Sequence, residues 1–222
     1  MSPGKEGSIC VGHAQVQVWL VPLDGLTDSV RSACSAWLAP AEAERYGRFI
    51  QAEARDQFLV ARACCEQRCT AIRVSADRPC NSVQTGLAPL SENRDTPQFN
   101  LSHTRGLVAL AITHEGEVGV DVEDFTRGAD VRALAGGLFS PAEAAKVDSA
   151  SGKAAKELFF RLWTLKEAYV KARGAGLSMA LDRFSFGQLG ANPQLLPASD
   201  DEAEAERWRF FRQRLRRAIS LR

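Results

Sequence analysis

The stretch Val118-Gly-Val-Asp-Val-Glu123 predicts a β-strand with one apolar face and one acidic face. Successive side chains of a strand point to opposite sides, so the three valines lie together while Asp121 and Glu123 share the other face. Their backbones are then about 7 Å apart. On an exposed strand such a face is simply solvated. A hard cation such as Mg²⁺ could instead use both carboxylates as oxygen ligands.

A second stretch, Trp163-Thr-Leu-Lys-Glu-Ala-Tyr-Val-Lys171, follows about forty residues later and predicts a helix. Trp163, Glu167 and Lys171 recur every four residues and form one stripe, with Lys166 at its edge. On a surface helix a Glu–Lys pair at this spacing adds only about 0.2–0.5 kcal/mol. Next to an acidic strand, however, one carboxylate and two ammonium groups suit a metal-bound diphosphate. Together the two stretches indicate a magnesium and pyrophosphate site.

These residues resemble a known family, the Sfp-type 4′-phosphopantetheinyl transferases. That family carries a G-(I/V)-D-(I/V)-E strand and a W-x-x-K-E-A-x-x-K helix, which match the two stretches above. Its x-F-N-x-S-H motif appears as Phe99-Asn-Leu-Ser-His103, and its F-S-x-x-E segment resembles Phe139–Glu143. Arg48-Phe49 and the stretch 58–62 resemble its first-half helices. The resemblance runs from about Trp37 to Phe186.

The resemblance implies an α+β fold, a mixed α/β architecture of two similar subdomains related by a pseudo-twofold. Each subdomain is expected to be a small antiparallel sheet packed with helices. Residues 1–116 would form the half that binds the nucleotide end of coenzyme A and docks the carrier. Residues 117–222 would carry the magnesium ligands and the catalytic helix.

The resemblance also implies the activity. The chain would transfer the 4′-phosphopantetheine arm of coenzyme A to a serine of an apo acyl or peptidyl carrier protein and release 3′,5′-ADP, with Mg²⁺ as cofactor. The proton acceptor is either Glu167 or a metal-bound water.

The site residues follow from the matched motifs. The implied metal ligands are Asp121, Glu123 and Glu167. The implied catalytic residues are Glu167, Lys171 and Glu143. The implied coenzyme A contacts are Arg45, Arg48, Arg62, Ser102, His103, Lys166 and Lys171.

The assignments of His103, the arginines and Glu143 have plain structural alternatives. A lone histidine that ends a strand, such as His103, is commonly a structural or solvent-exposed residue. Arginines on an amphipathic helix are commonly a solvated face. An acidic residue such as Glu143 is favoured in the first turn of a helix. The chain also departs from the family at Gln57, where relatives often place a basic residue, and at Gly86-Leu-Ala-Pro89, where they have Gly-Lys-Pro.

Periodicity and turn residues predict the elements along the chain. Residues 98–102, 107–113 and 117–123 are expected to form an antiparallel meander, which places His103 at the same end of the sheet as Glu123. A loop is expected over 77–97. Further expected strands span 15–21 and 181–189, with closing strands around Trp208 and Phe210. The expected helices span 28–38, a stretch from Pro40, 54–72, a stretch capped by Ser140, and 154–172, which ends at Gly174.

Composition excludes several classes of protein. The 222 residues have a formal net charge of +1 and an ordinary apolar fraction, typical of a globular protein. No apolar run is long enough for a membrane span or signal, so a cytoplasmic protein is expected. The basic C-terminus alternates with apolar residues, which favours closing strands over nucleic-acid binding. Six cysteines lack a C-x-x-C pair, and Cys65 falls on a core face. Two family-like halves in one chain make a monomer the simpler expectation.

Two other functions stay open on the sequence. A Mg²⁺-dependent phosphodiesterase or nuclease also clusters Asp, Glu and Lys around a metal, and it would act without a carrier protein. A non-catalytic module that binds coenzyme A or a carrier would keep the fold without the reaction.

Overall fold

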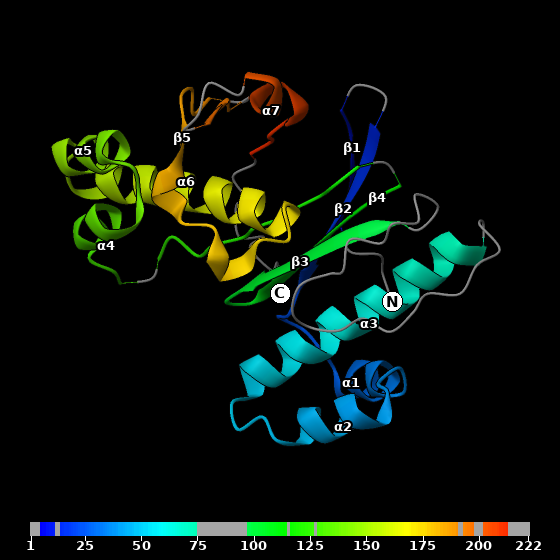
Figure 1. Ribbon diagram of the computed structural model, residues 1–222. Helices are drawn as coiled ribbons and strands as arrows, with labels where there is room; N and C mark the ends of the chain where they lie inside the picture. The colour runs from blue at the N-terminus through cyan, green and yellow to red at the C-terminus, as the bar shows by residue number, and fades with distance from the viewer. Residues whose placement is uncertain are drawn as a thin grey trace. The chain divides into compact units, whose positions relative to one another are not determined.

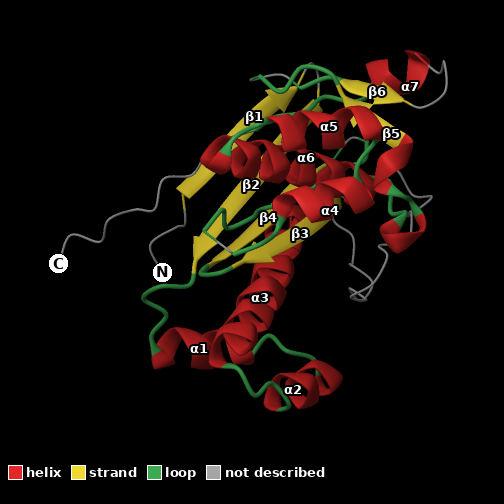
Figure 2. Cartoon of the chain, turned by 90° about the vertical axis from the view of Figure 1, so that its left-hand side faces the viewer, coloured by secondary structure: helices red, strands yellow, loops and turns green. Residues whose placement is uncertain are grey.

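The computed structural model describes residues 5–11, 14–74, 97–114, 116–126, 128–190, 193–197 and 202–212. The chain divides into two compact units. Unit 1 comprises Met1–Thr126 and Glu167–Ser178, and unit 2 comprises Arg127–Lys166 and Met179–Arg222. Each unit combines helices with a small antiparallel sheet, which confirms the α+β class (Figures 1 and 2). The pseudo-twofold relation stays a prediction.

The units do not coincide with residues 1–116 and 117–222. Residues 117–124, here called the acidic stretch, and the last turns of the helix Gly152–Ala172 pack within unit 1, so the expected boundary at 116 runs through a packed region. The division of functional roles between the two expected halves stays a prediction.

A four-stranded antiparallel sheet forms the centre of unit 1. Its strands are β1 (Lys5–Val11), β2 (Ala14–Pro22), β3 (Gln98–Thr104) and β4 (Leu107–Thr113), in the order β1-β2-β4-β3. The nearly continuous apolar sequence of β4 suits this central place, where every residue after Leu107 is buried. The expected strands at 15–21, 98–102 and 107–113 are thereby confirmed.

One face of this sheet packs against α3 (Ala52–Val74), as Figure 1 shows. Cys65 of α3 is fully buried among Trp19, Leu110 and Ile112, which confirms it as a core residue. Leu101 of β3 packs on the same cluster. Because strand side chains alternate, the polar residues on either side of Leu101 face away from α3.

Two short helices precede α3. They are α1 (Asp28–Ser35), which begins after the N-cap Thr27, and α2 (Pro40–Gly47), which begins at a proline. Both were expected from the sequence, as was α3. The loop expected over 77–97 lies almost wholly outside the described residues.

The strand expected over 117–123 is not formed, so the predicted meander is wrong at its third member. The central strand β4 pairs with β2 and β3, which leaves neither of its edges for another strand. Residues 117–124 have no strand assignment and lie beside β3 instead. The alternating sequence indicated an extended chain but could not indicate its hydrogen-bond partner.

Unit 2 contains the helices α4 (Val131–Leu138), α5 (Pro141–Ser149), the part of α6 (Gly152–Ala172) up to Lys166, and α7 (Glu202–Arg207). A short hairpin joins β5 (Phe184–Phe186) to β6 (Leu195–Pro197). The strand expected over 181–189 is therefore shorter and follows a 3-10 turn at Leu181–Arg183. Helix α4 was not predicted.

Aromatic side chains fill the core of unit 2. The rings of Phe139 and Phe159 stack with centroids 5.1 Å apart, and Phe186 meets Phe210 edge to face at 4.9 Å. Residues 208–212 are not a strand, although Phe210 is buried as an inward-facing strand residue would be. No helix in the described ranges combines the length and the apolar content needed to cross a membrane.

Candidate functional site

A ladder of side chains from β3 holds the acidic stretch in place. Every second backbone N–H of residues 120–124 donates to a polar side chain of β3, and both segments advance by two residues per bond in the same direction. The stretch therefore runs parallel to β3. The bonds join Val120 N to Asn100 Oδ1 (3.0 Å), Val122 N to Ser102 Oγ (3.2 Å) and Asp124 N to Thr104 Oγ1 (3.0 Å).

The same stretch is pressed against the end of α6 at Gly119. A β-carbon added there would lie 1.9 Å from the carbonyl oxygen of Ala168 and 2.7 Å from the backbone nitrogen of Ala172. Both atoms belong to the helix backbone and cannot turn aside. Glycine is thus the one residue that permits this approach, which brings the side chains of α6 level with the acidic stretch.

Asp121 and Lys171 form the centre of the site. Lys171 Nζ donates to Asp121 Oδ1 at 2.7 Å, to Ser102 Oγ at 3.0 Å and to the carbonyl oxygen of Val120 at 3.3 Å. Ser102 Oγ also lies 3.0 Å from Asp121 Oδ1. The Asp121 side chain is only 6% exposed, and its other oxygen, Oδ2, is buried without a hydrogen-bond partner in the described structure.

Glu167 is half-buried beside this pair. Burial raises the pKa of its carboxyl, the negative charge of Asp121 raises it further, and Glu123 adds a smaller effect of the same sign. The Lys171 ammonium opposes them. A carboxyl whose pKa is raised by two neighbouring acids lies in a locally negative environment, where a cation would be stabilised.

Asp121 is therefore paired with Lys171, and the pKa of Glu167 responds to Asp121, Lys171 and Glu123. Within the described ranges, no group of three or more Asp, Glu, His or Cys side chains is placed so that it could hold a metal ion. One oxygen of Asp121 is engaged by Lys171. The assignment of Asp121, Glu123 and Glu167 as metal ligands stays a prediction.

Lys166 and Glu143 occupy a different environment, the interior of unit 2. Their side chains are 0% and 1% exposed and form an ion pair at 2.8 Å. Lys166 Nζ also donates to the carbonyl oxygens of Leu181 (2.7 Å) and Phe184, so its three N–H groups have three acceptors. Burial lowers the pKa of Lys166, and the bond to Glu143 opposes that shift.

Glu143 is likewise saturated by its neighbours. Its Oε2 accepts from Ser140 Oγ at 2.9 Å, and its Oε1 accepts from the backbone N–H of Phe186 at 2.9 Å. Ser140 precedes α5 as its N-cap, although its hydroxyl bonds to Glu143 rather than to the helix backbone. The pair thus ties together α5, α6 and the β5 hairpin. In this structure both side chains serve the packing of unit 2, and neither reaches solvent.

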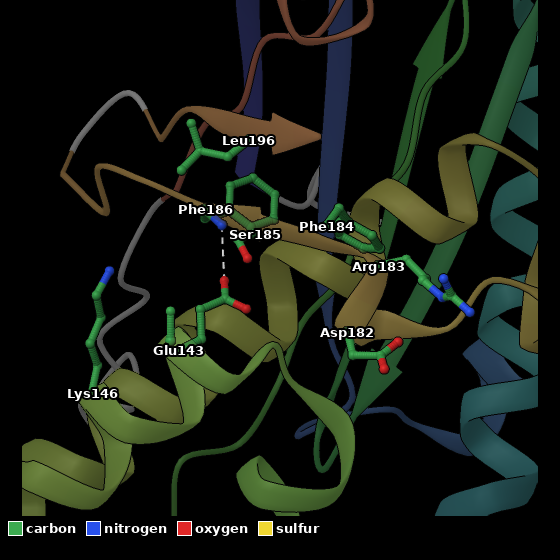
Figure 3. Close-up of a pocket in the computed structure, with 9 residues that line it drawn as sticks. Glu143, Lys146, Asp182, Arg183, Phe184, Ser185, Phe186 and Leu196 are labelled. Carbon is green, nitrogen blue, oxygen red and sulfur yellow. Dashed lines mark hydrogen bonds between the residues drawn. The ribbon is translucent and has the colours of Figure 1, made fainter. Parts of the chain in front are cut away.

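A hollow of about 250 Å³ opens beside this pair, and Figure 3 shows it with Glu143 directed at the backbone of Phe186. Its lining includes both apolar and charged side chains, and all of it belongs to unit 2. The lining residues are Ala142, Glu143, Lys146, Asp182, Arg183, Phe184, Ser185, Phe186 and Leu196. The acidic side chains of unit 1 are not among them, so this hollow is not the predicted magnesium site.

The predicted nucleotide contacts lie at separate places in unit 1. Arg62 is 4% exposed and paired with Glu42. Arg48 is exposed and paired with Glu44, and Arg45 lies over the ring of Phe58 at 5.2 Å.

His103 is exposed, and strand alternation places it on the face of β3 opposite Ser102. His103 was expected at the same end of the sheet as Glu123. The hydrogen bond from Asp124 N to Thr104 Oγ1 agrees with this, because it joins the residues that follow Glu123 and His103.

Comparison with known proteins bears on this arrangement. The model of the 4′-phosphopantetheinyl transferase superfamily matches residues 117–220, which include the acidic stretch and all of α6. Over these residues the chain is similar to that superfamily.

Individual members of the superfamily extend the match. The 4′-phosphopantetheinyl transferase HetI of Nostoc sp. is 29% identical over 168 residues, 74% of this chain and 70% of HetI. The Synechocystis protein slr0495 is 28% identical over 211 residues, 90% of this chain and 80% of that protein. The 4′-phosphopantetheinyl transferase AcpT of Escherichia coli K12 is 46% identical over 76 residues, 34% of this chain and 39% of AcpT.

Sequence reasoning missed two residues at this candidate site, Asn100 and Thr104. Each holds the acidic stretch through a backbone N–H. A signal was present, because polar residues alternate with Leu101 along β3 while β4 beside it is almost wholly apolar. Such alternation on a strand beside a buried neighbour indicates a polar face with a partner, and the acidic stretch is that partner.

Proposed function

We propose that this chain transfers the 4′-phosphopantetheine arm of coenzyme A to a serine hydroxyl of an apo acyl or peptidyl carrier protein, releasing 3′,5′-ADP, as an Sfp-type enzyme. The observation that carries the proposal is the ion pair of Asp121 with Lys171 within unit 1, beside Glu167, whose pKa Asp121 and Glu123 both raise. The similarity of residues 117–220 to the transferase superfamily supports it.

Mg²⁺ is the proposed cofactor, and the residues fit a hard cation. Asp121 Oδ2 is a buried oxygen without a partner in the described structure, which is costly for an acceptor unless something else satisfies it. Asp121 and Glu123 both raise the pKa of Glu167, so a cation would relieve their mutual repulsion. Asp121, Glu123 and Glu167 would hold the ion. When bound, it offsets charge on the phosphate oxygens of coenzyme A.

The chain's own side chains would carry the remaining steps. The carrier serine attacks the β-phosphorus of coenzyme A, its oxygen forms the new bond, and the bond to the leaving 3′,5′-ADP breaks. Glu167 is proposed to accept the serine proton, since a carboxyl with a raised pKa is a better base. Lys171 is proposed to stabilise the leaving phosphate as a point charge.

The nucleotide end of coenzyme A is proposed to contact exposed residues of unit 1. Arg45, Arg48 and His103 are exposed, so phosphate groups could approach them at the surface. Ser102 and Arg62 are buried and bonded within the unit, so they would act by positioning. Lys166 and Glu143 are proposed to stabilise the fold of unit 2.

The proposal also covers the location, the oligomeric state and the partners of the protein. We propose a cytoplasmic monomer without nucleic-acid partners. Cys34 is a buried thiol outside any disulfide, as is usual in a reducing compartment.

The deciding experiment incubates the purified chain with coenzyme A, Mg²⁺ and a panel of apo acyl and peptidyl carriers. Intact-mass spectrometry of each carrier should show a gain of one phosphopantetheine arm, and EDTA should abolish the gain. No gain on any carrier, with coenzyme A binding retained, would indicate a binding module. Phosphodiester cleavage without a carrier would indicate a hydrolase.

Asp121→Asn is expected to lower kcat/KM for the carrier at least about 100-fold, because a metal contributes several kcal/mol to phosphate charge stabilisation. The amide has nearly the same volume but lacks the charge. Initial rates over a range of Mg²⁺ concentrations measure the effect. Asp24→Asn, at an exposed aspartate of unit 1, is the matched control and should behave as wild type. A wild-type rate for Asp121→Asn at limiting Mg²⁺ would remove Asp121 from the metal site.

Lys171→Ala is expected to lower kcat about 100-fold while KM for coenzyme A changes less, because a contact to the leaving phosphate matters most in the transition state. Steady-state kinetics with varied coenzyme A separates the two constants. Lys153→Ala changes an exposed lysine of the same helix and should leave both unchanged. An unchanged kcat with a raised KM would assign Lys171 to ground-state binding instead.

A further inference from the structure

We infer that Asn100 and Thr104 are positioning residues for the transfer reaction. They fix the register of the acidic stretch by accepting hydrogen bonds from its backbone N–H groups. The inference rests on the proposed function. It assigns a role to two side chains that the proposed mechanism does not use.

The stretch needs such a device because it is not a strand. Residues 117–124 carry Asp121 and Glu123, yet they are not part of the backbone ladder that fixes the register of β3 and β4. An extended chain that slips by one residue turns every side chain to its opposite face. A slip here would exchange the carboxylates for valines.

The side-chain ladder prevents that slip at three consecutive points. Its middle rung, Ser102, also bonds to Asp121 and Lys171 and so belongs to the site itself. The outer rungs reach the stretch through the backbone N–H groups of Val120 and Asp124, one on each side of the two carboxylates. Asn100 and Thr104 therefore set where both carboxylates stand.

The anchors themselves are held firmly. Asn100 and Thr104 belong to a strand paired along its length with the central β4. The carbonyl oxygen of Thr104 accepts from Gln57 Nε2 of α3 at 3.0 Å, which links this end of β3 to the helix. Because β3 is held in place, its side chains Asn100 and Thr104 also hold the acidic stretch in place.

Thr104 gives the sharpest test, because valine has nearly the same shape without the acceptor and serine keeps the acceptor. Thr104→Val is expected to lower kcat/KM about tenfold, as the loss of one hydrogen bond allows. It should also raise the Mg²⁺ concentration for half-maximal rate. Thr104→Ser should restore both values to within about twofold of wild type.

Amide hydrogen exchange supplies a readout that does not depend on activity. Exchange at the backbone N–H of Asp124 should speed up about tenfold in Thr104→Val and return to the wild-type rate in Thr104→Ser. Asn100→Ala should act in the same way at Val120, and it keeps the test available if Thr104→Val does not fold.

Thr27→Val is the matched control, since it deletes the same kind of bond, from Val30 N to Thr27 Oγ1, at the N-cap of α1 in the same unit. It should leave kcat/KM, the Mg²⁺ response and exchange at Asp124 unchanged. The inference is overturned if Thr104→Val keeps wild-type kinetics, or if Thr27→Val causes an equal kinetic loss. A wild-type chain that modifies no carrier defeats the proposed function, while exchange at Asp124 and Val120 still decides whether the two side chains hold the stretch.

Discussion

Alanine in place of Lys166 is expected to lower the free energy of unfolding by about 3–5 kcal/mol, the cost of leaving one member of a buried ion pair without its partner. Glu143 would remain 1% exposed with its counter-charge gone, and the carbonyl oxygens of Leu181 and Phe184 would each lose a donor. Urea denaturation of the purified variant measures the loss.

Two further variants make this expectation specific. Lys146→Ala removes an exposed lysine of α5 and should cost less than about 1 kcal/mol. The double replacement of Lys166 and Glu143 by methionine should lower the free energy of unfolding by less than the sum of the two single replacements. Each single change leaves one buried charge without its partner, whereas the double change leaves none. Equal stabilities for Lys166→Ala and wild type would show that the pair contributes nothing to the fold.

The same variant separates two roles for Lys166. A lysine that contacts coenzyme A would, on replacement, raise KM for coenzyme A in a protein of normal stability. A lysine that ties α6 to α5 and the β5 hairpin would lower stability, with the kinetic constants of the folded fraction changed little. The complete burial of its side chain favours the second outcome.

Local sequence patterns predicted much of this structure because they depend on residues close together in the chain. The helices α1, α2, α3, α5 and α6 follow from periodicity and caps, and β2, β3 and β4 follow from apolar runs with turns between them. The four-residue spacing of Glu167 and Lys171 placed both on the side of α6 that meets Asp121.

The features that sequence reasoning missed depend on long-range partners. Lys166 is next to Glu167, yet one helical step turns it into unit 2, where its partner is supplied by another helix. The sequence alone favours an exposed site for a lysine, since this residue type is almost never fully buried unless paired. The acidic stretch alternates apolar and acidic residues as a strand does, but its backbone N–H groups bond to side chains of β3. The alternation of residues cannot distinguish this arrangement from pairing within a sheet.

Gly119→Ala is expected to reduce transfer at least about 100-fold, the size of effect that a 1 Å misplacement of reacting groups produces. The added methyl would lie 1.9 Å from the carbonyl oxygen of Ala168, far inside contact distance, and the obstructing atoms belong to the backbone of α6. The stretch must then move away from the helix. Asp121 moves with it, and its 2.7 Å bond to Lys171 is lost.

The result should differ from that of a general loss of stability. Gly47→Ala adds the same methyl at a glycine with open space around it, at the end of α2 in the same unit, and should leave transfer unchanged. Kinetics at saturating carrier, alongside thermal unfolding, distinguishes a displaced site from an unfolded one. If Gly119→Ala transferred at the wild-type rate, α6 and the acidic stretch would not need to touch, and the carboxylates would reach coenzyme A without the close approach that glycine permits.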